Sequence, residues 1–248
     1  AWILKTLLGL ERTASVPFTF EDLTLGAICG GSDTFSGITG NPAVGNAYDA
    51  LVDKGCRVIF EETGELIGCE AHLASRAETP ELAQAIMACM QKTVNYYATL
   101  GHGSFAVGNA DGGLTTIEEK SLGAYAKSGS RPIRGLIKPG ERPPQPGLYL
   151  LDVIPDGEVR FGFPNINDNA EIAELMACGS HIILFVTGRG SVVGSAIAPV
   201  IKVCANPQTY RNMKDDMDVN AGRFVEEDCS LDEIGAEIVE LITRVAEG

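Results

Sequence analysis

The sequence predicts an α/β fold: a mostly parallel, Rossmann-like sheet flanked by helices, with glycine-rich loops at the carboxyl ends of the strands. Short apolar segments alternate along the chain with longer segments that repeat an apolar residue every three or four positions. Polar, glycine-rich turns stand between several of these segments. With 248 residues, 45% of them hydrophobic, the chain can bury one large core. We therefore expect residues 1–248 to form one α/β domain, with a candidate sub-boundary in the proline-rich stretch 138–147.

The first half of the chain opens with a strand–turn–helix unit. Residues 23–29 predict a buried strand, and a glycine-rich turn follows it. We expect Asn41 to cap the next helix, with Pro42 in its first position and Gly55 ending it. Residues 57–60 predict the second strand.

The second half repeats this alternation with clear helix-start signals. Thr79 begins a long helix that runs to about residue 100, and Thr116 and Ser230 each begin a capping-box pattern. The remaining segments are predicted from their apolar pattern. They are strands at 133–137, 148–153, 181–186 and 199–204, and helices at 167–177 and from 230 to the C-terminus.

The charge of the chain excludes some classes of partner. Nineteen Lys and Arg against 33 Asp and Glu give a formal charge of −14. Such a surface repels phosphate backbones and anionic lipids, so we expect neither nucleic-acid nor membrane binding. No apolar run reaches the length of a membrane span and no signal peptide is visible, which predicts a cytoplasmic protein. Three of the seven cysteines, Cys89, Cys178 and Cys204, lie in apolar segments and predict reduced, buried thiols.

Three glycine-rich turns are the candidate substrate site. They span residues 29–37, 108–115 and 187–191. Glycine lets backbone N–H groups approach an anion, and Arg189 can bind a carboxylate with two hydrogen bonds. One such turn alone is ordinarily just a tight turn, but three that are rich in hydroxyls favour a binding site. None of them has a standard nucleotide fingerprint. The candidate binding residues are Gly31, Ser32, Thr34, Gly113, Thr115, Thr187, Arg189 and Ser191.

Carboxylates near Cys and His side chains suit a divalent metal such as iron or manganese. Glu62 follows the second strand and Asp33 follows the first, so both can face the same crevice. Glu61 and Glu65 are expected to be an ordinary solvated helix start. His72, in the next helical stretch, is more often a surface or packed imidazole than a ligand. Two readings of the acidic cluster at 215–218, a solvated loop and a ligand group, remain open.

These segments resemble the altronate and galactarate dehydratase family, from about residue 23 to residue 224. The resemblance rests on several ordered motifs. They are Cys29-Gly30-Gly31-Ser32-Asp33 with Ser36-Gly37, Asn41-Pro42-Ala43, Glu62-Thr63 with Glu65, and residues 112–123, 127–129, 187–190, 199–202 and 216–222.

The resemblance implies a hydro-lyase that acts on a sugar acid such as altronate or galactarate and uses a divalent metal, Fe²⁺ or alternatively Mn²⁺. It also implies a small N-terminal SAF-type domain or subunit outside this chain, which makes the chain the C-terminal catalytic half, and a homo-oligomeric enzyme. The family includes a sulfolactate sulfo-lyase, which keeps C–S cleavage as an alternative. This chain departs from the dehydratase pattern at 104–109, which lacks two prolines, and at Ala71, where a His is usual and His72 stands next to it.

Dehydration of a 2,3-dihydroxy acid removes the proton beside the carboxylate and expels the neighbouring hydroxyl, so it needs a base and stabilisation of negative charge. Lys120, Lys202 and His72 are the candidate bases. Asp33, Glu62 and Cys29 are the candidate metal ligands, and Arg189 with the turn N–H groups would hold the carboxylate. Two other interpretations stay open: a non-catalytic module that senses sugar acids, and a domain that only dimerises the enzyme.

Overall fold

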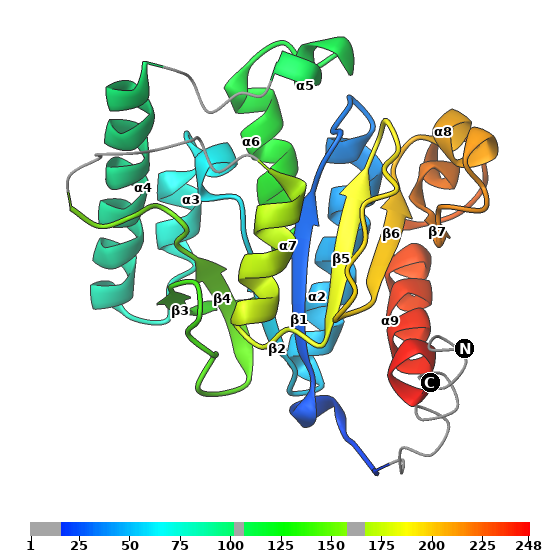
Figure 1. Ribbon diagram of the computed structural model, residues 1–248, viewed down its shortest axis with the longest axis horizontal. Coiled ribbons are helices and arrows are strands. Elements are labelled where there is room, and N and C mark those ends of the chain that lie inside the picture. Colours follow the sequence, from blue (N-terminus) through cyan, green and yellow to red (C-terminus); the bar gives the residue numbers. More distant parts are fainter. Residues whose placement is uncertain (1–15, 102–106, 158–166) are drawn as a thin grey trace, which may run out of the picture.

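Seven parallel strands form one sheet in the order β3-β4-β2-β1-β5-β6-β7 (Figure 1). The computed structural model describes residues 16–101, 107–157 and 167–248. The strands are β1 (Thr24–Cys29), β2 (Arg57–Phe60), β3 (Ile133–Ile137), β4 (Gly147–Leu151), β5 (Ile182–Thr187), β6 (Val200–Cys204) and β7 (Val219–Asn220). The described helices are α2 (Asn41–Asp53), α3 (Glu70–Ser75), α4 (Pro80–Leu100), α5 (Val107–Asp111), α6 (Ile117–Ala126), α7 (Asp168–Ala177), α8 (Pro207–Asn212) and α9 (Leu231–Glu247). This arrangement confirms the predicted parallel α/β fold.

Side chains that alternate along the strands build a core on each face of the sheet. In β5, Leu184 belongs to a cluster that includes residues of α2 and α9. Its neighbours Ile183 and Phe185 belong to a second cluster, with residues of α7 and the end of α4. All six residues of β1 are buried because the strand is central and covered on both faces. The carboxyl end of β1 therefore lies between β2 and β5, at the edge of the sheet where parallel α/β proteins bind ligands.

The helix starts agree with the predicted capping residues except at Asn41. Thr79 accepts a hydrogen bond from the Leu82 N–H, and Ser230 forms a complete capping box with Glu233. Asn41 was expected as an N-cap, and this is wrong. A π-helical turn over Ser36–Gly40 runs directly into α2, so Asn41 is already helical. Its side chain is buried and its Nδ2 lies 4.0 Å from the Cys29 Sγ.

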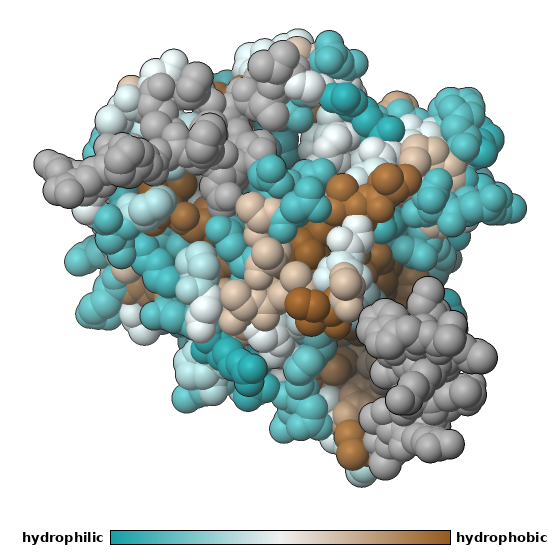
Figure 2. All heavy atoms as spheres, viewed as in Figure 1, coloured by the Kyte–Doolittle hydropathy of each residue, from teal (hydrophilic) through white to brown (hydrophobic). Residues whose placement is uncertain are grey.

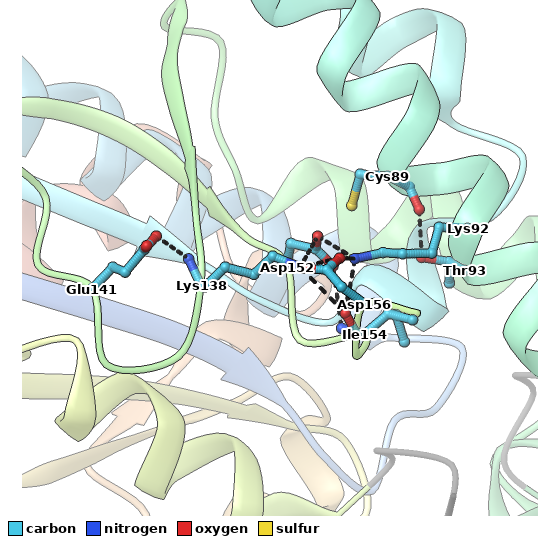
Figure 3. Close-up of polar contacts among 8 residues, drawn as sticks. All are labelled: Cys89, Lys92, Thr93, Lys138, Glu141, Asp152, Ile154 and Asp156. Atoms are coloured by element: carbon cyan, nitrogen blue, oxygen red, sulfur yellow. Dashed lines mark hydrogen bonds and ion pairs between the residues drawn. The ribbon is translucent and has the colours of Figure 1, made fainter. Parts of the chain in front are cut away.

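One ion-pair network ties α4 to the β3–β4 side of the sheet (Figure 3). Asp152, which is 3% exposed, accepts from Lys92 at 2.6 Å and pairs with Lys138 at 2.8 Å. Asp156 pairs with the same two ammonium groups, each at 2.9 Å. Lys92 comes from α4, whereas Lys138 and Asp152 follow β3 and β4, so the network joins three elements.

The connection from β5 to β6 contains no helix, and it leaves apolar side chains at the surface. Val192 and Ile197 are 74% and 84% exposed on this connection. Figure 2 shows apolar atoms on this face of the molecule, over β5 and β6. Within the described residues, none of the helices combines the length and the apolar character that a membrane crossing requires.

Candidate functional site

The three glycine-rich turns meet at the carboxyl edge of the sheet. The N–H groups of Gly188 and Arg189 donate to the Gly31 carbonyl at 3.2 and 2.9 Å, and the Thr34 N–H donates to the Gly112 carbonyl at 3.0 Å. β1 and β5 are neighbours in the sheet, so the turns that follow them leave side by side. The turn before α6 is brought to them by the chain that connects β2 to β3. Binding of a substrate by these turns stays a prediction.

Cys29, the last residue of β1, lies beside these turns at the centre of a buried charged cluster. Its Sγ is 2.9 Å from the Lys120 Nζ, 3.5 Å from the Lys127 Nζ and 3.3 Å from a Glu62 oxygen. The other Glu62 oxygen accepts from the Cys29 N–H at 2.9 Å. Lys127 also forms an ion pair with Glu62. All four side chains are less than 5% exposed, so water screens these charges very little.

Glu62 has a backbone conformation that non-glycine residues rarely adopt. Its φ of 87° is the only positive φ of a non-glycine residue in the described part of the chain. Such a conformation costs on the order of 1–3 kcal/mol and persists only where the surroundings hold it. Here the Cys29 N–H and the Lys127 ammonium hold the carboxylate. The turn of the backbone after β2 thus serves to direct Glu62 to Cys29.

Glu65 completes a set of three atoms able to bind a metal ion. One ligand atom each from Cys29, Glu62 and Glu65 lies within 4.8 Å of the others. The Lys120 ammonium stands among them, 2.5 Å from a Glu65 oxygen and 3.9 Å from a Glu62 oxygen. A thiolate and two carboxylates that converge on one positive group form a donor set that fits a divalent transition metal.

The two lysines decide the protonation of Cys29. Burial by itself raises the pKa of the thiol, but the charges of Lys120 and Lys127 outweigh it and leave the pKa below its ordinary 9.0. Burial would lower the pKa of Lys120, and the negative charges of Cys29 and Glu65 raise it instead. These charges favour the thiolate form of Cys29 and the ammonium form of Lys120.

Lys120 lies in α6 and Lys127 is its C-cap, so the two lysines, seven residues apart, lie about two helical turns apart on one face. Thr116 caps the helix by accepting from the Glu119 N–H, while the Glu119 carboxylate bonds to Thr115. Gly123 lies between the lysines, where an added Cβ would come within 3.0 Å of the Gly37 Cα. This close approach brings α6 against the turn after β1.

Asp33, a predicted metal ligand, lies outside the three-ligand set. One of its oxygens accepts from the Ser36 N–H at 3.0 Å and from the Ser36 hydroxyl at 3.2 Å. The other accepts from the Asn206 Nδ2 at 2.8 Å. The buried carboxylate thus shapes the turn after β1 and links it to the chain after β6. Of the predicted ligands, the structure brings together Cys29 and Glu62.

His72 and Lys202, the other two candidate bases, lie elsewhere. His72 is exposed on α3, with its ring 5.9 Å from that of Tyr125. Lys202 lies in β6, separated from β1 by β5, and its N–H donates to Asp218 at 2.7 Å. Among the candidate bases, Lys120 is the one that the described contacts place in the Cys29 cluster.

Most predicted substrate-binding groups lie in the turns themselves. Thr187 accepts from the Gly190 N–H at 3.0 Å, Ser191 accepts from the Val193 N–H at 3.2 Å, and Thr34 donates to the Gly112 carbonyl at 3.2 Å. Arg189 is exposed and donates to the carbonyl of Gly108. The Ser32 hydroxyl is buried without a hydrogen-bond partner.

A narrow cleft leads from the turn after β1 toward Lys120. It encloses about 10 Å³, which is about the room for one water molecule. Its lining comprises Ser32, Asp33, Ser36, Gly37, Asn41, Leu114, Glu119, Lys120 and Gly123. Of the departure at 104–109, residues 104–106 lie outside the described residues. Gly113 has a φ of 89° and borders Thr34, as a tight turn requires.

The expectation that Glu61 and Glu65 are solvated is wrong. They are 0% and 5% exposed, because β2 ends between β1 and β4 and the chain after it turns into the crevice. Lys127 was not among the predicted site residues. The seven-residue spacing of Lys120 and Lys127 in a predicted helix was the signal that could have identified it.

The comparisons with known proteins point to one family. A model described as D-galactarate/altronate dehydratase, C-terminal, matches residues 20–248. The chain is 35% identical over 239 residues to the (2R)-sulfolactate sulfo-lyase subunit beta of Chromohalobacter salexigens, covering 94% of this chain and 58% of that protein. It is 34% identical to the altronate dehydratase of Bacillus subtilis, covering 96% and 46% of the two chains. It is also 34% identical to the galactarate dehydratase of Escherichia coli, covering 92% and 42%. The chain thus spans about half the length of these relatives.

Proposed function

Since the chain belongs to the D-galactarate/altronate dehydratase family and matches its C-terminal part, we propose that it carries the active site of a metal-assisted hydro-lyase acting on a sugar acid. The substrate is an acid such as altronate or galactarate, and the product is a keto-deoxy acid. The proposal includes a further domain or subunit, because the relatives are about twice as long as this chain.

The buried Cys29–Glu62–Glu65 cluster with its two lysines is the observation that carries this proposal. An elimination beside a carboxylate needs positive charge where the carbanion develops and a proton for the departing hydroxyl. The cluster has donors for a cation and a protonated Lys120 at one place, under three glycine-rich turns.

Cys29, Glu62 and Glu65 would hold the metal ion, which supplies Lewis-acid stabilisation of negative charge on the substrate. The chain's own residues supply the proton donor, its surroundings and the contacts to the substrate carboxylate. Lys120, whose Nζ lies 2.9 Å from the Cys29 Sγ and 2.5 Å from a Glu65 oxygen, would give a proton to the departing hydroxyl. Lys127 balances Glu62 and fixes its direction. Arg189 and the N–H groups of the turns would bind the substrate carboxylate.

A sulfo-lyase is the second candidate, favoured by the 35% identity to the sulfolactate sulfo-lyase subunit. The two reactions share proton removal beside a carboxylate and differ in the leaving group. Sulfite leaves as a stable anion, whereas hydroxide must be protonated as it leaves. Loss of the Lys120 proton should therefore slow dehydration more than sulfite release.

Turnover of altronate, galactarate and sulfolactate by the full-length protein, with and without added Fe²⁺, tests the proposal. Iron-dependent formation of a keto-deoxy acid is the expected result, and sulfite release would select the second candidate.

Glu62→Gln should lower kcat at least about 100-fold and reduce bound iron, since loss of even an outer partner of a metal site costs 10–100-fold. Glu118→Gln, an exposed change on the same helix as the lysines, is the matched control and should have no such effect. Turnover that is independent of metal and of Glu62 would contradict the metal-assisted mechanism.

A further inference from the structure

The narrow cleft beside Lys120 has room for one small group. It encloses about 10 Å³, which is about the room for a single water molecule. Gly37 and Gly123 form part of its wall, and a Cβ added at Gly37 would lie 3.2 Å from the Gly123 Cα. The wall is therefore closely packed at this point. The cleft can take a hydroxyl group or a water molecule, but no bulkier polar group.

Several polar side chains that line the cleft already have partners in the protein. One oxygen of Asp33 accepts from Ser36 and the other accepts from Asn206. A carboxylate oxygen of Glu119 accepts from the N–H and the hydroxyl of Thr115, each at 2.7 Å. These hydrogen bonds fix the turns and the start of α6 around the cleft.

Two other lining residues have a buried polar atom without a partner. They are Ser32, through its hydroxyl, and Asn41, through its Oδ1, and neither atom has a hydrogen-bond partner in the described part of the chain. Ser32 is 2% exposed and Asn41 is 1% exposed. Buried polar groups are normally hydrogen-bonded. Two unpaired atoms on residues that line one water-sized space therefore indicate a ligand there.

A hydroxyl group matches the hydrogen-bonding groups around this space. Asn41 Oδ1 can only accept a hydrogen bond, whereas the Ser32 hydroxyl can donate one. Lys120 also lines the cleft, and its contacts with the Cys29 Sγ at 2.9 Å and a Glu65 oxygen at 2.5 Å leave one of its three N–H groups for a ligand. A hydroxyl has one hydrogen to donate and two lone pairs that accept, so it can use all three residues of the cleft.

We propose that the cleft binds the departing hydroxyl of the substrate, with Asn41 and Ser32 as the residues that hydrogen-bond to it. This inference rests on the hydro-lyase function proposed above. In that reaction a base takes the proton from C2, and the electron pair of the C–H bond forms the C2–C3 double bond. The C3–O bond breaks with its electron pair on oxygen, and a proton from Lys120 completes a water molecule. The enol that remains rearranges to the keto-deoxy acid.

The size of the cleft also distinguishes between the two leaving groups. Hydroxide, once protonated, is a water molecule and fills a space of about 10 Å³. Sulfite contains a sulfur and three oxygens and needs several times that room. We therefore expect the substrate to be an acid with a hydroxyl on C3, and sulfolactate to be a poor substrate.

Ser32→Ala and Asn41→Leu in the full-length, Fe²⁺-loaded protein test this role. Each variant removes one hydrogen bond to the departing hydroxyl, so kcat/KM for dehydration of the sugar acid should fall about 10-fold or more. The 3-deoxy analogue of the same acid lacks that hydroxyl. Its inhibition constant as a competitive inhibitor should therefore be the same in both variants as in the unchanged protein. A merely structural role would weaken binding of the analogue as well.

Ser180→Ala is the matched control. Ser180 also has a buried hydroxyl without a partner among the described residues, but it precedes β5 at the opposite edge of the sheet. This variant should leave kcat/KM unchanged. Thermal unfolding checks that each variant is folded, and Ser32→Ala, which removes a single oxygen, serves if Asn41→Leu does not fold.

Two kinds of failure can be told apart. Unchanged kcat/KM in the folded variants, or an equally large loss of analogue binding, would overturn the leaving-group role while the hydro-lyase function stands. An unchanged full-length protein that dehydrates no sugar acid, or that releases sulfite from sulfolactate faster than it dehydrates any sugar acid, would overturn the proposed function and this role with it.

Discussion

At the scale of single residues, Cys29 shows how two lysines can reverse the effect of burial. Cys56 and Cys89 are also buried, and there burial outweighs the charges of the nearby lysines and raises the pKa of each thiol to about 12. Cys29 is as little exposed as Cys89, yet Lys120 and Lys127 bring its pKa below 9.0. The reactive form of a cysteine is its thiolate, so of these three thiols the one at the carboxyl edge of the sheet has the electrostatics of a ligand or nucleophile.

Removing one lysine should return Cys29 to the behaviour of an ordinary buried thiol. In metal-free protein, the ultraviolet absorbance of the Cys29 thiolate should appear at a pH below 9.0, and Lys120→Met should shift it to higher pH. The Cys29→Ser protein supplies the baseline from the other cysteines. An unchanged midpoint in Lys120→Met would contradict the assigned role of the lysine.

The same shift predicts how stability depends on pH. A thiol whose folded pKa lies below its unfolded value stabilises the fold above the unfolded pKa, and this contribution is lost as the pH falls through the folded pKa. We therefore expect denaturation of the metal-free protein, measured at pH values between the folded and the unfolded pKa of Cys29, to show stability that rises with pH. This rise should be absent in Cys29→Ser.

At the scale of elements, the site depends on how closely α6 approaches its neighbours. Gly45 lies in α2, and a Cβ added there would fall within contact distance of the Ala126 carbonyl at the end of α6. Gly37 and Gly123 make a similar approach at the middle of α6. Small residues at these crossings let the lysines of α6 reach Cys29.

Gly45→Ala should destabilise the protein although Ala is the better helix former. In a free helix interior the change would gain roughly 1 kcal/mol. Here the clash with backbone atoms should instead cost about 1–3 kcal/mol, as overpacking does. Urea unfolding measures the difference. Gly194→Ala is the control, since a Cβ at Gly194 meets nothing within 4 Å and should change stability little. A stabilised Gly45→Ala protein would show that α6 can shift freely.

At the scale of the whole molecule, α4 is held to the sheet by charge as well as by packing. Asp152 is the buried member of the network in Figure 3, and it pairs with a lysine from α4 and a lysine that follows β3. Asp156 pairs with the same lysines but is 74% exposed, so water screens its contribution.

Asp152→Asn should therefore destabilise the protein much more than Asp156→Asn. Loss of the buried charge leaves two ammonium groups without their main partner and should cost about 1–3 kcal/mol. Asp156→Asn, which changes the exposed carboxylate, should have little effect on stability. Thermal or urea unfolding of the two variants compares them directly, and equal effects would mean that the network does not anchor α4.

How much could be predicted differs between the fold and the site. The periodicity and the capping residues predicted β1 to β6 and most helix starts, because both signals are local in the chain, whereas the two-residue strand β7 was not predicted. Asn41 failed as a cap because a π-helical turn, stabilised by contacts with the rest of the fold, precedes it. Cys29, Glu62 and Lys120 were predicted from motifs, and the structure places them together. Glu65 and Lys127 were missed as members of that cluster.

The sequence by itself determined the parallel α/β fold, the glycine-rich turns and their position at the ends of strands, since these follow from hydrophobic alternation and from the backbone freedom of glycine. Only the tertiary structure decided which charged side chains are buried together. Asp33 and Glu62 look alike in the sequence, yet Asp33 is bound by Ser36 and Asn206 while Glu62 faces Cys29 and Lys127. The physical reason is that the pairing and the pKa of a buried charge depend on distances between strands and helices that are remote in sequence, and local pattern does not encode those distances.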